Sequence, residues 1–282
     1  MNRVSTPQAA DRSRCSDAAA SRGMKAVLLV GGMGTRLRSV VQTKPKPLAL
    51  VGSYSLLQLL IRQLRHQGIR RLVLCTGYLA EQIENEFGDG RDLELTIEYS
   101  REPHPLGTAG AVKLAQRYLL DMPEFLVMNG DSFMETDFCR MLEFHRAHGG
   151  LVSMAALHVQ NSNRYGRVEA DSSGRVIKFA EKTGDNSPGL INAGVYVFDR
   201  GVLEHIPDGS ASLEQDVFPQ LLDRGIHVFE QHGMFIDIGT PEDYARAQSI
   251  SDRLYQAAFC EDGPEPDQEG CQGSKARRVN EG

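Results

Sequence analysis

A glycine-rich turn directly after a short apolar run is the feature that most constrains the fold. Residues 25–30 (Lys-Ala-Val-Leu-Leu-Val) have strand character, and the segment 31–37 that follows reads Gly-Gly-Met-Gly-Thr-Arg-Leu. Glycines let the backbone turn sharply and bring peptide N–H groups close to a ligand. Arg36 adds a planar fork of donors that suits phosphate oxygens. A buried strand that runs into such a turn predicts a phosphate site at the edge of a sheet.

A second positive charge follows in the segment 44–48, Lys-Pro-Lys-Pro-Leu. Lys46 stands between two prolines, which we expect to hold its backbone extended and to aim its ammonium group. The strand, the glycine turn, Arg36 and Lys46 together predict a site for a polyphosphate.

The spacing of the glycines excludes two commoner phosphate loops. The turn is not G-x-G-x-x-G, and the next expected strand, 72–75, carries no acid for a ribose hydroxyl. A dinucleotide-binding oxidoreductase is therefore excluded. The turn is not G-x-x-x-x-G-K-[ST] either, which argues against a P-loop NTPase.

Strand-like and helix-like stretches alternate through the first half of the chain. This alternation predicts a mostly parallel sheet with helices on both faces and ligands at the carboxyl ends of the strands. In the second half, turns that carry Asn and Gly separate apolar runs, as in antiparallel additions. The expected strands are 72–76, 93–99, 125–128, 151–157, 167–170, 176–179 and 195–198, and the expected helices are 55–64, 79–87 and 109–119.

The composition predicts one globular domain between two polar tails. The 282 residues are 41% hydrophobic and 24% charged, which is ordinary for a globular protein. Residues 1–23 and 259–282 lack a periodic apolar face, so we expect both to be disordered around a domain at 24–258.

The net charge of −6 argues against a general binder of nucleic acid or of anionic membranes. No apolar stretch approaches the roughly 18 residues of a membrane span, and none of signal-peptide length opens the chain, so we expect a cytoplasmic protein. The sequence does not determine the oligomeric state and leaves a homodimer open.

Two aspartates stand where a metal ion could be held. Asp131 comes directly after the expected strand 125–128, where Mg²⁺ is commonly bound in phosphoryl transfer, although it could instead cap the next helix. Asp237 stands within the apolar run 234–238 and would be costly to bury without a partner or a metal.

The segments 31–37 and 44–48 together resemble the signature of the sugar-1-phosphate nucleotidyltransferases, which make NDP-sugars. The resemblance covers about residues 24–250 and implies a single α/β domain, Rossmann-like (GT-A-like), with a mixed, mostly parallel sheet. It implies a Mg²⁺ cofactor on Asp131 and Asp237, because the segment 235–241 resembles the family's aromatic-x-Asp-x-Gly-Thr-Pro pattern. It also implies that Arg36 and Lys46 act as the catalytic cations.

The resemblance further assigns the substrate contacts. Thr108 could also be a helix N-cap, Gly166 and Asn192 could serve turns, and Glu181 with Lys182 could be an exposed charge pair. The nucleotide contacts it implies are Val30, Gly31, Gly32, Gly34, Thr35, Gly107 and Thr108, and the sugar-phosphate contacts are Gly166, Glu181, Lys182 and Asn192.

Within the family, the segment 102–110 resembles guanylyltransferases of mannose type, and the segments 164–169, 189–196 and 235–244 most resemble guanylyltransferases that act on a manno-configured heptose. The implied substrates are GTP and a sugar 1-phosphate, with D-glycero-α-D-manno-heptose 1-phosphate expected and mannose 1-phosphate as the alternative. A protein of another class, a catalytically silent regulatory subunit that binds NDP-sugars, should have lost at least one of Arg36, Lys46, Asp131 and Asp237. All four are present.

Overall fold

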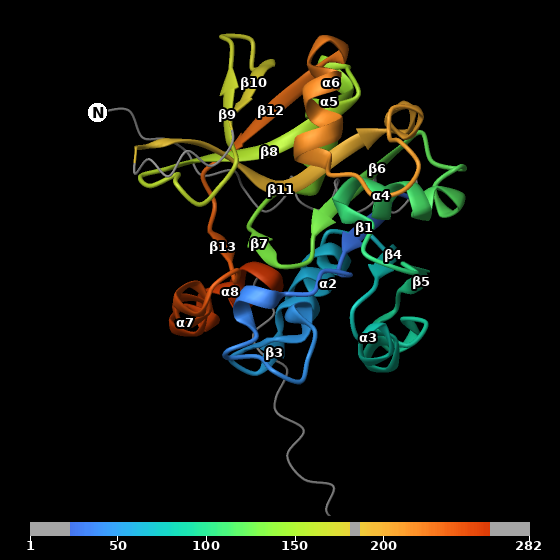
Figure 1. The fold of residues 1–282 in the computed structure, drawn as a ribbon, viewed down its shortest axis with the longest axis vertical. Coiled ribbons are helices and arrows are strands. Elements are labelled where there is room, and N and C mark those ends of the chain that lie inside the picture. Colours follow the sequence, from blue (N-terminus) through green and yellow to red (C-terminus); the bar gives the residue numbers. More distant parts are fainter. Residues whose placement is uncertain (1–22, 181–186, 260–282) are drawn as a thin grey trace, which may run out of the picture.

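The computed structural model describes residues 23–180 and 187–259 (Figure 1). The predicted tails lie outside these ranges, except that Gly23 forms a turn and Phe259 ends a helix. Glu181 and Lys182 also lie outside them. The main sheet of the described residues contains β1 (Lys25–Leu29), β4 (Arg71–Thr76), β5 (Thr96–Arg101), β6 (Glu124–Asn129), β8 (Val152–Val159), β9 (Arg167–Ala170), β10 (Val176–Ala180), β11 (Gly189–Asp199) and β12 (Ile226–Gln231).

The main sheet is parallel in its first half and mixed in its second. The order is β10-β9-β11-β6-β1-β4-β5, with β8 paired to β11 and β12 paired to β8. Strands β5, β4, β1 and β6 run parallel, β11 lies antiparallel to β6 and β8, and β12 is parallel to β8. The predicted mixed, mostly parallel α/β sheet in one domain is thereby confirmed.

Helices cover both faces of this sheet, and the strongest local signal marks the start of α2. Ser55 accepts a hydrogen bond from the Gln58 amide while the Gln58 side chain accepts one from the Ser55 amide, which forms a capping box. The helices are α2 (Leu56–His66), α3 (Ala80–Phe87), α4 (Gly107–Leu114), α5 (Phe138–His148), α6 (Phe218–Leu221), α7 (Pro241–Ser249) and α8 (Ser251–Phe259).

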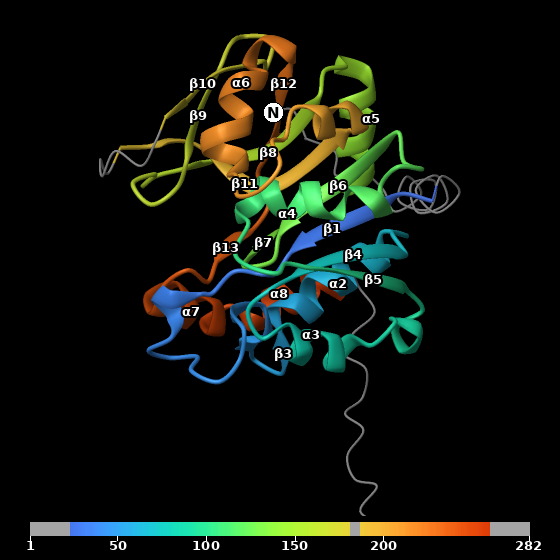
Figure 2. The same ribbon diagram turned by 45° about the vertical axis from the view of Figure 1, so that its right-hand side comes forward.

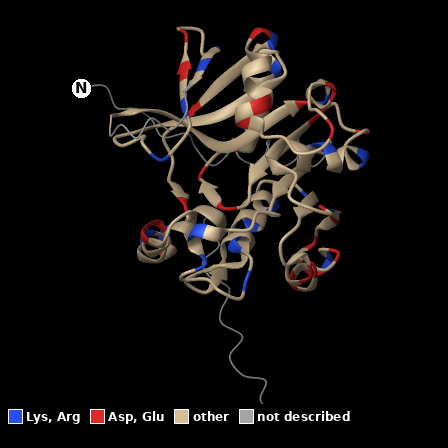
Figure 3. Ribbon diagram, viewed as in Figure 1, with Lys and Arg blue, Asp and Glu red and all other residues tan. Residues whose placement is uncertain are grey.

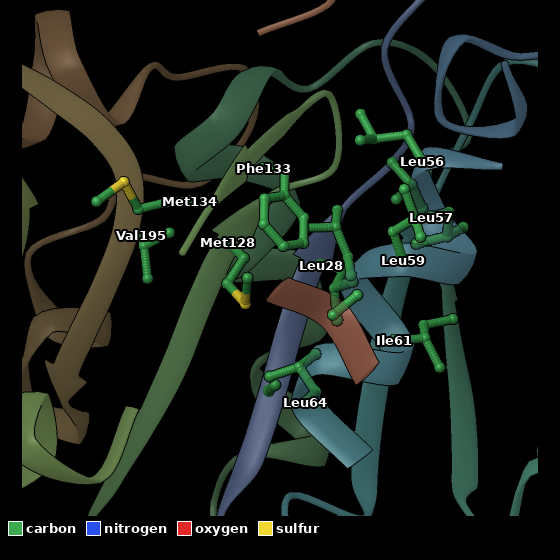
Figure 4. Close-up of a cluster of buried hydrophobic side chains, with 14 of the residues drawn as sticks. Leu28, Leu56, Leu57, Leu59, Ile61, Leu64, Met128, Phe133, Met134 and Val195 are labelled. Carbon is green, nitrogen blue, oxygen red and sulfur yellow. The ribbon is translucent and has the colours of Figure 1, made fainter. Parts of the chain in front are cut away.

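The core divides into two clusters because successive strand residues point to opposite faces. In β1, Leu28 belongs to the cluster under α2, whereas Val27 belongs to the cluster under α4 and α6. Figure 2 shows β1 between α4 and α2. In Figure 4, Leu28 lies with Met128 and Phe133 among the leucines of α2. The turn after β1 is therefore anchored by a strand that is buried on both sides.

Two small sheets hold the segments around the expected site. One pairs β2 (Leu50–Val51) with β3 (Tyr54–Ser55), and the other pairs β7 (Ser132–Met134) antiparallel with β13 (Phe235–Asp237). The second pairing brings the carboxyl-terminal part of the chain to the end of β6.

Several predicted boundaries are wrong for local reasons. Strand β5 begins at Thr96 instead of residue 93, because Arg91–Leu93 forms a 3-10 turn after Gly90, whose φ is 84°. The expected helix 109–119 is α-helical only as Gly107–Leu114 and continues as a 3-10 turn. Strand β11 begins at Gly189, so Asn192 lies inside the strand rather than ahead of it.

Charged residues of both signs are interspersed over the ribbon (Figure 3). No helix within residues 23–180 and 187–259 has the length and apolar character needed to cross a membrane.

Candidate active site

A cleft of about 420 Å³ lies beyond the carboxyl ends of β1 and β6, against the glycine turn. Carboxyl ends of parallel strands are the usual place for a ligand in such sheets. The cleft is lined by almost all the residues predicted for nucleotide binding and chemistry: Val30, Gly31, Gly32, Gly34, Thr35, Arg36, Lys46, Gly107, Thr108 and Asp131.

Two glycines of the turn are required by close approaches. Gly34 has a φ of 56°, and a Cβ atom there would lie 2.9 Å from Cβ of Lys46. A Cβ atom on Gly31 would lie 2.3 Å from Oε1 of Glu102. Side chains at these positions would displace Lys46 or Glu102, which is the physical reason for glycine in both places.

Lys46 connects the glycine turn to both predicted metal ligands. Its Nζ atom lies 2.6 Å from Oδ2 of Asp131 and 3.8 Å from Oδ1 of Asp237, and its side chain is only 9% exposed. The expectation of extended backbone at Lys46 is wrong. Pro45 is extended, but Lys46–Leu48 forms one 3-10 turn, closed by a bond from the Ala49 amide to the Lys46 carbonyl.

Asp131 and Asp237 meet because β13 pairs with β7, which places Asp237 opposite Ser132. The Ile238 amide also donates to the Asp131 carbonyl at 3.1 Å. Burial raises the pKa of Asp237, and the neighbouring negative charge of Asp131 raises it further, while Lys46 and the Gly239 N–H group lower it. The two neighbouring carboxylates of Asp131 and Asp237 therefore favour binding of a further positive charge beside them.

The donor set fits Mg²⁺ in part. Within the described residues, no group of three or more His, Cys, Asp or Glu side chains could hold a metal ion. The protein would supply two carboxylates, and triphosphate oxygens and water would complete the octahedron that Mg²⁺ requires. Two carboxylates that share one buried ammonium suit such an arrangement.

The alternative roles left open for two residues are resolved by their contacts. Asp131 does not cap the next helix, because Asp137 accepts from the amides of Cys139 and Arg140 at the start of α5. Thr108 is not an N-cap, because Leu106 occupies that position. The Thr108 hydroxyl instead accepts from the Leu213 amide at 2.8 Å.

Arg36 lies on the 3-10 turn η2 (Thr35–Leu37), whose Leu37 is buried and anchors it. The Arg36 side chain is exposed and has no ion-pair partner within the described part of the chain. Its donors are thus available to a ligand in the cleft.

Gly166 and Asn192, predicted to bind the sugar phosphate, lie together but do not line this cleft. The Asn192 amide donates to the Gly166 carbonyl at 3.1 Å. The Asn192 side chain donates from Nδ2 to the Tyr196 hydroxyl at 2.7 Å and accepts from the Gly194 amide at 2.9 Å. These bonds fix which way the amide of Asn192 points.

A partly buried polar network that the sequence did not reveal joins Asn192 to Thr108. The Tyr196 hydroxyl donates to Oε1 of Glu214 at 3.4 Å, and Thr108 donates to Oε2 of Glu214 at 3.1 Å. Glu214 belongs to η7 (Leu213–Val217), 106 residues along the chain from Thr108 and 18 from Tyr196. No local spacing signals such a contact, because it depends on how η7 packs against α4 and β11.

The chain matches the nucleotidyl transferase family over residues 25–252. It belongs to this family. The match covers the cleft, both carboxylates and the sheet that carries them, so the roles assigned by resemblance to the cleft residues and the two carboxylates concern one site. For Gly166, Asn192 and the residues of the cleft these roles stay predictions.

Two curated relatives of this nucleotidyl transferase are 39% identical to it. One, a mannose-1-phosphate guanylyltransferase of Mycobacterium tuberculosis, is matched over 82% of this chain and 65% of its own length. The other, the D-glycero-alpha-D-manno-heptose 1-phosphate guanylyltransferase of Aneurinibacillus thermoaerophilus, is matched over 80% of this chain and 97% of its own length. The chain thus spans less than two thirds of the first relative and nearly all of the second.

A solved structure is also similar to this chain in sequence and in fold. HddC from Yersinia pseudotuberculosis, crystallised in complex with GMP-PN, is 32% identical and superposes with a TM-score of 0.73. The superposition covers 81% of this chain and 99% of HddC.

Proposed function

We propose that this nucleotidyl transferase is a Mg²⁺-dependent guanylyltransferase that joins GTP to D-glycero-α-D-manno-heptose 1-phosphate and releases pyrophosphate. The observation that carries the reaction type is Lys46, buried between Asp131 and Asp237 in a cleft lined by the glycine turn. The heptose is favoured over mannose by the relative that is matched over 97% of its length.

The chemistry needs positioning and charge neutralisation rather than a general base. A sugar phosphate is already anionic at neutral pH, since the second pKa of a phosphate monoester is about 6. One of its oxygens attacks the α-phosphorus of GTP, a new P–O bond forms, and the bond to the β-phosphate oxygen breaks as pyrophosphate leaves in line. Arg36 would hold the triphosphate, and Lys46 would offset charge between the two phosphate groups.

Asp131 and Asp237 would hold the magnesium ion, which when bound would neutralise charge on the triphosphate and the leaving group. Their pairing across β7 and β13 supports this assignment. GTP and sugar phosphates are metabolites of the cytoplasm, where we place the enzyme.

Two other functions are weaker. Mannose 1-phosphate as the sugar substrate is favoured by the Mycobacterium tuberculosis relative, of which the chain spans 65%. A silent regulatory subunit would not need Arg36, Lys46, Asp131 and Asp237, yet this chain keeps all four around one site.

A substrate matrix tests the proposal. Pyrophosphate release would be measured for GTP, ATP, UTP, CTP and dTTP, each with heptose, mannose or glucose 1-phosphate and each without any sugar phosphate. We expect turnover that requires both substrates and is fastest with GTP and the heptose. Equal kcat/KM with ATP or UTP would contradict the base, and a clear preference for mannose or glucose 1-phosphate would contradict the sugar.

A further inference from the structure

The carboxylate of Glu214 is held by three hydroxyl groups. Its Oε2 atom accepts from Thr108 at 3.1 Å and from Ser212 at 3.0 Å. Its Oε1 atom accepts from Tyr196 at 3.4 Å. An ionised carboxylate has no proton of its own, so each of the three hydroxyl groups must point its single proton at Glu214.

Backbone amides fix the direction of the two bonds on the Oε2 side. The Thr108 hydroxyl accepts from the Leu213 amide at 2.8 Å. The Ser212 hydroxyl accepts from the Gln215 amide at 3.2 Å. A hydroxyl oxygen that faces an amide N–H group must turn its proton elsewhere, and both of these protons go to Glu214. The Oε2 position must therefore be occupied by an acceptor.

The Tyr196 hydroxyl passes this direction on to Asn192. Burial and the negative charge of Glu214 raise the pKa of Tyr196 well above 10, so the hydroxyl keeps its proton at neutral pH. Because that proton points at Glu214, the Tyr196 oxygen accepts from Nδ2 of Asn192, 2.7 Å away. Oδ1 of Asn192 accepts from the Gly194 amide at 2.9 Å. Among the described residues, the second Nδ2–H group of Asn192 has no acceptor and is free to donate to a ligand.

An irregularity in β11 brings these two side chains together beside the cleft. Four residues of a regular strand span about 13 Å, but the register between β11 and β8 shifts between Asn192 and Tyr196. Gly194 lies in this stretch with a φ of 73°, and a Cβ atom there would lie 2.4 Å from Nδ2 of Asn129. Asn129 lines the cleft, so the irregular stretch packs against its wall. Irregular strands of this kind are common next to active sites.

The proposed function places the sugar phosphate at Asn192, and the inference rests on it. We propose that Glu214 is a positioning residue for the sugar substrate. By accepting the Tyr196 proton, it fixes the Asn192 side chain as a donor toward an oxygen of the sugar 1-phosphate. Glu214 itself needs no contact with either substrate.

Glu214→Gln keeps the shape of the side chain but adds a donor. The new amide oxygen must take the Oε2 position, because Thr108 and Ser212 both donate there, so the new NH₂ group faces the Tyr196 oxygen. The Tyr196 proton then finds an acceptor only if the Asn192 amide turns over, which breaks the other hydrogen bond of that amide. The substitution should therefore raise KM for the sugar 1-phosphate about tenfold, the value of one net hydrogen bond. KM for GTP should stay within about twofold of the wild type, because the Thr108 side of the network is unchanged.

A double-substitution cycle separates this relay from a general structural role. Tyr196→Phe removes the relay, so adding Glu214→Gln to it should change KM for the sugar phosphate no further, whereas independent effects would multiply to about 100-fold. Pyrophosphate release would be measured with GTP and the sugar 1-phosphate that the wild type uses fastest. Glu204→Gln, the same substitution on an exposed side chain of η6 (Arg200–Glu204), is the matched control and should keep the wild-type KM values.

Melting temperatures would verify that the variants fold. The inference would be overturned by an unchanged KM for the sugar phosphate in Glu214→Gln, by equal rises in KM for both substrates, or by effects that multiply in the double variant. A wild type without turnover on any sugar phosphate would instead contradict the proposed function.

Discussion

A single ammonium group balances two carboxylates in the cleft. Lys46 lies 2.6 Å from Asp131 and 3.8 Å from Asp237, and Gly34 gives it room to do so. When one member of a partly buried charge cluster is removed, the remaining charges lose their compensation. Substitutions of Lys46, Asp131 or Asp237 should therefore lower turnover much more than substitutions of exposed charged residues nearby in the chain.

Replacing Lys46 by Met tests this expectation. We predict a fall in kcat of about 100-fold or more, because a charge aimed at the reacting phosphates is lost. Lys44→Met is the matched control: Lys44 belongs to the same segment but is exposed. Steady-state pyrophosphate release measures both variants, and similar losses in the two would show that the position of Lys46 is unimportant.

The Tyr196 hydroxyl should affect the sugar substrate selectively. It accepts from Asn192, so Tyr196→Phe removes one of the two hydrogen bonds that orient the Asn192 side-chain amide. We predict that KM for the sugar 1-phosphate rises about tenfold, the value of one net hydrogen bond, while KM for GTP changes little. Tyr118→Phe, which removes a hydroxyl bonded to the Tyr99 carbonyl, is the control. Equal changes in both KM values would place Tyr196 outside sugar recognition.

At the level of elements, the carboxyl-terminal helices hold the hairpin that follows Lys46. Tyr255 of α8 donates to the Val51 carbonyl at 2.7 Å and accepts from the Ser53 amide. Tyr244 of α7 donates to the Leu50 carbonyl at 2.6 Å. Residues of α7 and α8 thereby fix the β2–β3 hairpin next to the segment 44–48.

Tyr255→Phe should loosen this hairpin. Loss of about 1 kcal/mol of net hydrogen bonding predicts a melting temperature lower by about 2–4 °C for a domain of this size. Amide exchange should accelerate in residues 50–55. Tyr99→Phe, which loses a bond to the Gly88 carbonyl, should leave exchange in that segment unchanged. Unaltered hairpin exchange in Tyr255→Phe would show that α8 does not hold it.

The sequence predicts elements with strong local signals and fails where contacts are distant. The short apolar runs and the helical spacing of the leucines in 55–64 predict β1, β4, β6 and α2 to within a few residues. The meeting of Asp131 with Asp237 could be expected only through resemblance, since it depends on the β7–β13 pairing. The links of Glu214 to Thr108 and Tyr196 could not be predicted at all, because nothing local marks them.

For the whole molecule, His145 makes the free energy of unfolding depend on pH. It lies in α5, is buried, and forms a hydrogen bond with Ser153 of β8 at 2.9 Å. Burial lowers its pKa below the ordinary 6.5, an effect that Glu124 and Asp199 oppose and that Arg146 and His227 reinforce. As pH falls, this histidine therefore binds a proton in the unfolded chain before it does so in the folded protein. The stability that neutral, buried His145 contributes is present above pH 6.5 and is lost as pH falls below it.

We accordingly predict that the free energy of unfolding falls between pH 7 and pH 5 and that His145→Gln reduces this slope. His66→Gln, on the exposed side of α2, is the control. Urea titrations at several pH values measure the slopes, and an unchanged slope in His145→Gln would exclude this histidine as the cause.

The central claim is that Asp131, Asp237 and Lys46 form the catalytic centre of a guanylyltransferase. Pyrophosphate release from GTP and D-glycero-α-D-manno-heptose 1-phosphate at saturating Mg²⁺, compared between the wild type and Asp237→Asn, tests it most directly. We predict turnover in the wild type that stops when Mg²⁺ is chelated, and a loss of about 100-fold or more in the variant. A silent wild type, or a variant that retains more than about half of the activity, would contradict the claim.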